Sequence, residues 1–124
     1  MARKQISIKS LDAIWSRVVK ILAGFKCEHC GRMDIRLNSH HVFGRRAKSV
    51  RWDVKNGVCL CVLCHRFSSK FSAHETPTLF DEWIINHRGK RWYNALRARH
   101  NQMWDGDREK VKAMLKKIET KGKL

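Results

Sequence analysis

The stretch RWDVKNGVCLCVLCH, residues 51–65, decides the fold, because it ends in a CxxC pair made by Cys61 and Cys64. A matching pair, Cys27 and Cys30, lies in CEHCG at residues 27–31. Each CxxC turn can present two thiolates to one side of a tetrahedral ion, and two such turns close the coordination shell. The sequence therefore predicts a structural zinc ion held by these four cysteines, with redox dithiols as the alternative.

The segment between the two pairs is long. Thirty residues separate Cys30 from Cys61, whereas paired zinc knuckles usually hold roughly 15–20 residues there. Because both ends of the segment are tied to one ion, we expect it to fold into a small structure of its own. It contains the adjacent histidines His40 and His41, and also Asn56.

The charge of the chain predicts an anionic partner. The 124 residues include 27 Lys and Arg against 11 Asp and Glu, which gives a formal net charge of +16. Such a charge strains a compact fold unless an anion offsets it. DNA is the partner we expect, because contacts of Lys and Arg with phosphates supply most non-specific affinity. An anionic membrane is less favoured, since the basic residues are not gathered on one amphipathic helix.

Neither an export signal nor a membrane segment is expected. The start, MARKQISIKS, lacks an apolar stretch of signal-peptide length. The longest uncharged apolar run, NGVCLCVLC, is far shorter than the ~18 residues of a spanning helix. We therefore expect an intracellular protein, in which cysteines favour metal over disulfides. The fifth cysteine, Cys59, is expected to be a small buried apolar side chain; a reactive thiol or substitute ligand is the alternative.

Apolar spacing and capping residues predict a single domain over residues 1–124 of the α+β class. Ser7 or Ser10 can cap the first helix, and a helix begins cleanly after Thr76, with Pro77 at its first position and Gly89 at its end. The expected helices span residues 7–23, 63–70, 76–88, 90–103 and 107–120, and the expected strands span 36–42 and 56–60. The later helices are expected to bury Leu79, Phe80, Trp83 and Ile84, then Trp92, Leu96 and Met103, and then Val111, Met114, Leu115 and Ile118.

The motif order resembles a known nuclease family. A histidine pair in SHHV, an asparagine opening NGVCLC and a histidine directly after Cys64 follow one another as in the HNH endonucleases. The chain looks closest to the small zinc-bearing members found in phages. This resemblance covers roughly residues 25–75 and implies a zinc-stabilised ββα-metal core flanked by the helices of 7–23 and 76–120. It also implies the cytoplasm of a phage host as the location.

The resemblance assigns a role to each of four residues. It implies that His40 and His65 are ligands of a catalytic divalent ion and that His41 is the general base. Asn56 would brace the loop that presents the base. Because neighbouring side chains of a strand point to opposite faces, His40 can hold the metal while His41 faces the attacking water. A neutral imidazole suits this task near pH 7.

The expected metal site departs from the common pattern of the family, since His40 stands where Asp is frequent. An imidazole-rich site without a carboxylate favours Mn²⁺, Ni²⁺, Co²⁺ or Zn²⁺ over Mg²⁺. His74 is a candidate third ligand or phosphate contact, with a capping or surface histidine as the alternative. His29, His87 and His100 are assigned no chemistry.

Basic residues directly after His41 are expected to bind DNA. Arg45, Arg46, Lys48 and Arg51 lie in GRRAKSVR, and arginine forks suit phosphate oxygens. A second basic surface is expected from Arg88, Lys90, Arg91, Arg97 and Arg99. No segment resembles a recognition helix that reads bases, so we expect weak sequence specificity.

These features predict a metal-dependent endonuclease that nicks or cleaves double-stranded DNA and leaves 5′-phosphate and 3′-hydroxyl ends, as the family does. A nuclease selective for branched or recombining DNA is a variant of this prediction. A non-catalytic zinc module that only binds DNA is the alternative from another class. The biological role, with phage packaging and recombination among the options, and the oligomeric state, including a dimer, stay open.

Overall fold

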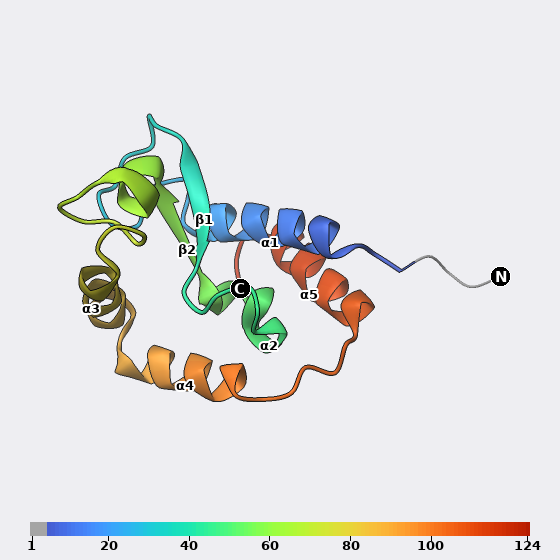
Figure 1. Ribbon diagram of the computed structural model, residues 1–124. Coiled ribbons are helices and arrows are strands. Elements are labelled where there is room, and N and C mark those ends of the chain that lie inside the picture. Colours follow the sequence, from blue (N-terminus) through green and yellow to red (C-terminus); the bar gives the residue numbers. More distant parts are fainter. Residues whose placement is uncertain (1–4) are drawn as a thin grey trace.

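The computed structural model describes residues 5–124, so the first four residues of the predicted domain lie outside the described part. The fold is α+β, as predicted (Figure 1). Its two-stranded antiparallel sheet consists of β1 (Leu37–His41) and β2 (Gly57–Cys61). The α-helices are α1 (Ile8–Leu22), α2 (Lys48–Arg51), α3 (Pro77–Arg88), α4 (Lys90–His100) and α5 (Arg108–Lys121). There are also two short turns, the 3₁₀ turn η1 (Val54–Asn56) and the π-helical turn η2 (Leu63–Phe67).

The strand register places the two adjacent histidines on opposite faces of the sheet. His40 pairs with Val58 and His41 pairs with Gly57. His40 lies edge-on to Phe80 of α3, with ring centroids 5.1 Å apart. His41 instead stacks on Trp15 of α1. The alternation expected for a strand is therefore confirmed for this pair.

Helix α1 covers one face of the sheet, and α5 packs against α1. The side chain of Ser7 caps α1 by accepting a hydrogen bond from the backbone N–H of Ser10 at 3.0 Å, so the first of the two expected caps is the one used. The buried face of α1 packs with Trp52, which directly follows α2, and with residues of β2 and α5 in one apolar cluster. Its fully or nearly fully buried members are Leu11, Ile14, Trp15, Val18, Val19, Trp52, Cys59 and Leu115.

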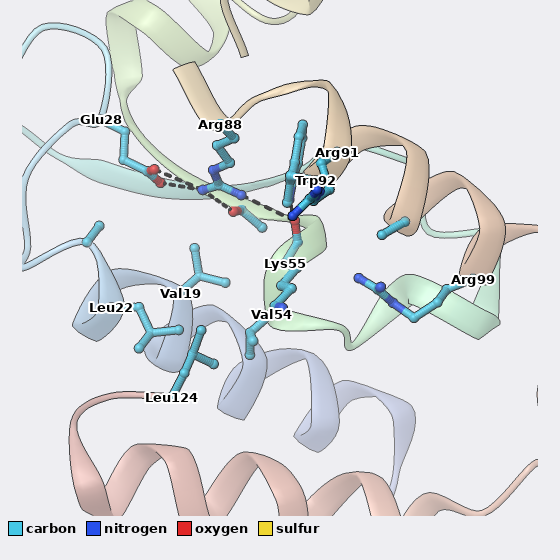
Figure 2. A pocket seen from close by; sticks show the side chains of 13 residues that line it. Val19, Leu22, Glu28, Val54, Lys55, Arg88, Arg91, Trp92, Arg99 and Leu124 are labelled. Atoms are coloured by element: carbon cyan, nitrogen blue, oxygen red, sulfur yellow. Dashed lines mark hydrogen bonds and ion pairs between the residues drawn. The ribbon is translucent and has the colours of Figure 1, made fainter. Parts of the chain in front are cut away.

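The cysteine-rich turns and α3 cover the other face. Phe80 and Ile84 of α3 pack with Val58 and Leu60 of β2 in a second apolar cluster. Arg88 closes this layer, because its Nη2 donates to Gly57 O at 2.8 Å and forms an ion pair with Glu28 Oε1 at 2.8 Å (Figure 2). The turn that carries Cys27 and Cys30 is thereby tied both to β2 and to the end of α3.

Several predicted local features are wrong. Met103 is 97% exposed because α4 ends at His100 and leaves it in a loop. Leu79 and Met114 are also exposed, since each helix buries a narrower stripe than its apolar pattern suggested. The hydroxyl of Thr76 does not cap α3 but bonds back to the backbone of Ser72. The short helix expected to reach Lys70 ends at Phe67.

Within residues 5–124, none of the helices combines the length and the apolar character that crossing a membrane requires.

Candidate metal centres and their surroundings

The four predicted zinc ligands lie together. The sulfur atoms of Cys27, Cys30, Cys61 and Cys64 all lie within 4.8 Å of one another. The sulfurs of Cys30 and Cys61 are 3.7 Å apart, and tetrahedral zinc with Zn–S bonds of about 2.3 Å requires about 3.8 Å between sulfurs. The cluster is therefore a candidate metal site whose geometry is consistent with structural zinc.

Both cysteine turns have the same local geometry. The backbone N–H of Cys30 points at the sulfur of Cys27, and that of Cys64 points at the sulfur of Cys61, each at 3.5 Å. Such N–H groups stabilise thiolates, which are the form that binds zinc. Gly31 permits the first turn to close, because it adopts a φ of +79°. The two turns thus supply matched pairs of thiolates from distant parts of the chain.

The fifth cysteine does not join the cluster. Cys59 is fully buried against α1, and its backbone N–H donates to Glu28 Oε2 at 2.8 Å. Burial and the nearby carboxylate of Glu28 raise the pKa of the Cys59 thiol to about 12. A thiol of this kind stays protonated near neutral pH and is a poor nucleophile or ligand. The first of the two interpretations of Cys59, a small buried side chain, therefore fits the structure.

Three histidines form a second cluster. His40 comes from β1, His65 from η2 and His74 from the turn before α3, and their nearest ring nitrogens all lie within 4.8 Å of one another. The Nε2 atoms of His65 and His74 are 3.1 Å apart. Ring planes cross at 63–78°, so the imidazoles converge edge-on instead of stacking. Three converging imidazole nitrogens fit a transition-metal ion such as Zn²⁺, Ni²⁺, Co²⁺ or Mn²⁺.

The local backbone explains how His74 reaches the cluster. The segment after η2 folds back along that turn, because Ala73 N donates to Cys64 O at 2.9 Å and His74 N donates to His65 O at 3.0 Å. The buried Ser72 fixes the return through mutual bonds with Thr76. His65 itself lies in the π-helical turn η2 and contacts Asn38 and His40 of β1. Such turns occur often at functional sites.

Two histidines of this cluster are suited to bind a metal cation, because their rings are neutral. Burial, together with the neighbouring histidines, lowers the pKa of His40 to about 3 and that of His65 to about 4. Both imidazoles are therefore neutral near pH 7 and can offer a lone pair. Neutral imidazole is the form that ligates metals.

His41 lies apart from this cluster and is held by two contacts. Its ring stacks on the indole of Trp15 with centroids 3.8 Å apart. Its Nε2 lies 2.9 Å from the carbonyl oxygen of Arg51. A carbonyl only accepts, so Nε2 carries the proton and Nδ1 keeps the lone pair. Burial lowers the pKa of His41 and so favours the neutral ring, although the hydrogen bond to the Arg51 carbonyl raises the pKa in the opposite direction.

Asn56 ties down the loop that follows His41. Its Oδ1 accepts from Phe43 N at 2.7 Å, and its Nδ2 donates to Phe43 O at 2.9 Å and to Val50 O at 3.0 Å. The side chain is fully buried. Because Val50 directly precedes Arg51, this clamp also fixes the carbonyl that holds His41.

One hollow joins the histidines to basic side chains. A cavity of about 640 Å³ is lined by all four of the histidines described, by Lys20, and by three arginines, Arg36, Arg45 and Arg66. Of the four predicted DNA contacts, Arg45, Arg46 and Lys48 are exposed. Arg51 is instead engaged by Asp12 through bonds of 2.7 and 3.0 Å, so few of its donors remain for phosphate.

The second predicted basic surface also contains both exposed cations and cations that are paired with carboxylates. It borders another hollow of about 640 Å³ between α1 and α4 (Figure 2). Arg88 is paired with Glu28, and Arg99 is paired with Asp53 at 2.6 Å. Lys90, Arg91 and Arg97 remain exposed. Two of its five cations thus serve the fold.

Three neighbours of the candidate site have no signal in the sequence that assigns them a role. Trp15 reads as one apolar residue of a helix, yet it supports His41. Asn38 reads as a strand residue, yet its amide contacts His65. His29 lies inside the first cysteine turn, and its Nδ1 is 3.4 Å from the sulfur of Cys64.

Comparison of the chain with protein-family models, with curated proteins and with solved structures finds no match. The resemblance of the motif order to the HNH endonucleases therefore stays a prediction.

Proposed function

We propose that the chain is a metal-dependent DNA endonuclease with an HNH-type core. The observation that carries the proposal is the shared hollow, in which a cluster of three histidines and a separately held His41 face one space. The order of the elements supports it as well. Two antiparallel strands, joined through α2 and η1 and followed by the turn η2 that carries His65, are compatible with the order of elements that a ββα-metal core would need.

His41 is the general base of this proposal. Its Nδ1 has the lone pair, because Nε2–H donates to Arg51 O. A water molecule in the hollow would give a proton to Nδ1 as its oxygen attacks the phosphorus atom. The bond from phosphorus to the 3′ oxygen then breaks, and this oxygen takes a proton from solvent water. The products are the 5′-phosphate and 3′-hydroxyl ends that the resemblance implies. General-base catalysis of this kind contributes typically 10²–10⁴-fold in rate.

His40, His65 and His74 are the residues that would hold the catalytic ion. When bound, a divalent ion supplies positive charge beside the scissile phosphate and the leaving oxygen. The cluster contains no carboxylate. We therefore expect Mn²⁺, Ni²⁺ or Co²⁺ to support more activity than Mg²⁺, which prefers oxygen ligands.

DNA would approach across the basic rim of the hollow. Arg45 and Arg46 lie in the exposed loop after His41. Arg36, which directly precedes β1, and Arg66 of η2 line the same hollow. Guanidinium groups bind phosphate oxygens without reading sequence. This arrangement favours cleavage with little sequence preference.

Supercoiled plasmid tests the proposal. Protein that retains zinc but is stripped of other metals is incubated with the plasmid, first alone and then with Mn²⁺, Ni²⁺, Co²⁺ or Mg²⁺. We expect relaxed or linear product only when metal is added, with Mg²⁺ the weakest, and product ends that ligase seals without prior phosphorylation. A gel shift without cleavage under every metal would instead support the non-catalytic zinc module.

A preference for distorted or branched DNA is the second candidate. Phe67 lines the same hollow and is 67% exposed. An exposed aromatic ring between basic residues can stack on an unpaired base, which is worth about 1–3 kcal/mol per base. Faster cleavage of a branched substrate than of the matched duplex, lost in Phe67→Ala, would favour this variant of the function.

A further inference from the structure

The side chain of Asn38 is committed to one metal-ligand candidate. Its Nδ2 lies 3.1 Å from Nδ1 of His65, and among residues 5–124 this amide has no other hydrogen-bond partner. Asn38 and His40 occupy alternate positions of β1 and so project from the same face of the strand toward η2. Asparagine is disfavoured in strands, so local propensity does not account for its presence here.

In the neutral ring of His65, the role of one nitrogen determines the role of the other. Nε2 faces Nε2 of His74 at 3.1 Å and is the nitrogen that converges with the cluster. If Nε2 gives its lone pair to a metal, the ring proton must sit on Nδ1, and Nδ1 then becomes a donor. Ligating histidines usually donate this second N–H to an acceptor that fixes the tautomer and the orientation of the ring.

We propose that Asn38 is a positioning residue for the His65 ligand and that its amide serves both states of the ring. In the metal-free protein, Nδ2 donates to the lone pair of His65 Nδ1. With metal on Nε2, rotation of the amide by half a turn presents Oδ1, which accepts the Nδ1–H. Because an amide has a donor and an acceptor of nearly the same shape, this exchange needs no movement of β1.

The proposal rests on the three-histidine metal site of the proposed function, but not on nuclease activity. The proposed role of Asn38 predicts the order in which variants at this position bind the second metal. Asn38→Leu keeps the approximate volume and removes both hydrogen-bonding roles, so we expect the second metal to bind about 10–100-fold more weakly. Asn38→Asp can only accept, which suits the metal-bound tautomer, so its affinity should equal or exceed that of the wild type.

Calorimetric titration of zinc-loaded protein with Ni²⁺ tests this order. Ser39→Ala is the matched control, because Ser39 is the next residue of the strand but bonds to Ser16 O on the opposite face. Thermal midpoints without Ni²⁺ separate a loss of affinity from a loss of folding. We expect Asn38→Leu alone to lose affinity and Asn38→Asp to restore it. Equal affinity of wild type and Asn38→Leu would overturn the proposal, as would an Asn38→Asp variant as weak as Asn38→Leu.

The tautomer of His65 gives a second readout that needs no variant. Long-range ¹H–¹⁵N spectra with diamagnetic Zn²⁺ should show the His65 proton on Nδ1 after the second metal binds; a proton on Nε2 contradicts the mechanism. Failure of the wild type to bind any second metal would contradict both this proposal and the three-histidine metal site on which it rests. Metal binding in the expected order of affinities, but without plasmid cleavage, would contradict only the proposed nuclease function.

Discussion

The ring of His41 lies flat on the indole of Trp15, with the two planes 8° from parallel and the centroids 3.8 Å apart. The indole is itself fixed, because its Nε1–H donates to Asp53 O at 2.9 Å. His41 is fixed at its edge by Arg51 O. The proposed base is thus held on one face and at one nitrogen before any substrate arrives, which is the preorganisation that a catalytic side chain needs.

Gly57 allows this stack to form. It pairs with His41 in the sheet, and a Cβ at this position would lie 2.9 Å from Trp15 Cζ2 and would also clash with Val19. We expect Gly57→Ala to lower the free energy of unfolding by about 1–3 kcal/mol, measured by urea denaturation. Gly44→Ala is the control, because nothing lies within 4 Å of its added methyl group. Equal stability of the two variants would show that α1 is not pressed against the sheet.

The four-cysteine cluster should hold one zinc ion that the fold requires. Binding of structural zinc is worth on the order of 10 kcal/mol, which is comparable with the whole stability of a domain. We therefore expect Cys27→Ser to lose zinc in metal analysis and to lose cooperative thermal unfolding. Cys59→Ala should keep a full equivalent of zinc. A Cys27→Ser protein that is fully folded and metal-free would contradict the structural role.

Asn56 should be a stabilising residue as well as a brace. Asn56→Ala leaves the N–H and O of Phe43 and the O of Val50 without their partner, and each buried unpaired group costs about 1–3 kcal/mol. We expect its urea midpoint to fall well below that of Lys55→Ala, an exposed neighbour. Its DNA cleavage should fall further than its folded fraction explains, because the loop carrying the Arg51 carbonyl loosens. Unchanged stability would refute the clamp.

Asp12 gives stability that depends on pH. Burial disfavours its charge, but hydrogen bonds from Arg51 and Trp52 outweigh burial and lower the pKa of Asp12 below its ordinary value of 3.8. Its folded pKa is therefore below its unfolded pKa. The contribution of ionised Asp12 is complete above the unfolded value and is lost as pH falls through the folded value.

The comparison of wild type with Asp12→Asn isolates this contribution. We expect the variant to be less stable near neutral pH, and the difference in free energy of unfolding to shrink below about pH 4. Acid also releases zinc from cysteine ligands, but it does so in both proteins, so the difference between them reports Asp12. A difference that stays constant down to acid pH would exclude the ion pair as its source.

Features set by neighbouring residues could be predicted from the sequence. The two strands lie within one residue of their expected bounds, because they are bounded by local signals. The two cysteine pairs are distant in the chain but meet as expected, because one tetrahedral zinc ion needs both CxxC turns. The cap of α1 at Ser7 could be predicted as well, because capping residues are a local signal. Predictions that relied on helical periodicity alone were less accurate, as the exposure of Met103 and Leu79 shows.

Contacts between distant residues that no sequence motif indicates could not be predicted. The stack of Trp15 on His41 depends on how α1 crosses the sheet, and Gly57 gives no hint of this in sequence. Arg51 reads as a phosphate contact until its partner Asp12, on α1, is known. His74 reaches the histidine cluster only because Ser72 folds the chain back beside η2.

Single-turnover cleavage by His41→Ala tests the central claim most directly. The variant is compared with wild type and with His87→Ala, whose ring stacks on Trp83 of α3 outside the hollow. Rate, DNA affinity and Ni²⁺ affinity are measured for all three proteins. We predict that His41→Ala alone loses about 10²–10⁴-fold in rate and keeps both affinities. Cleavage by His41→Ala at the wild-type rate would contradict the account.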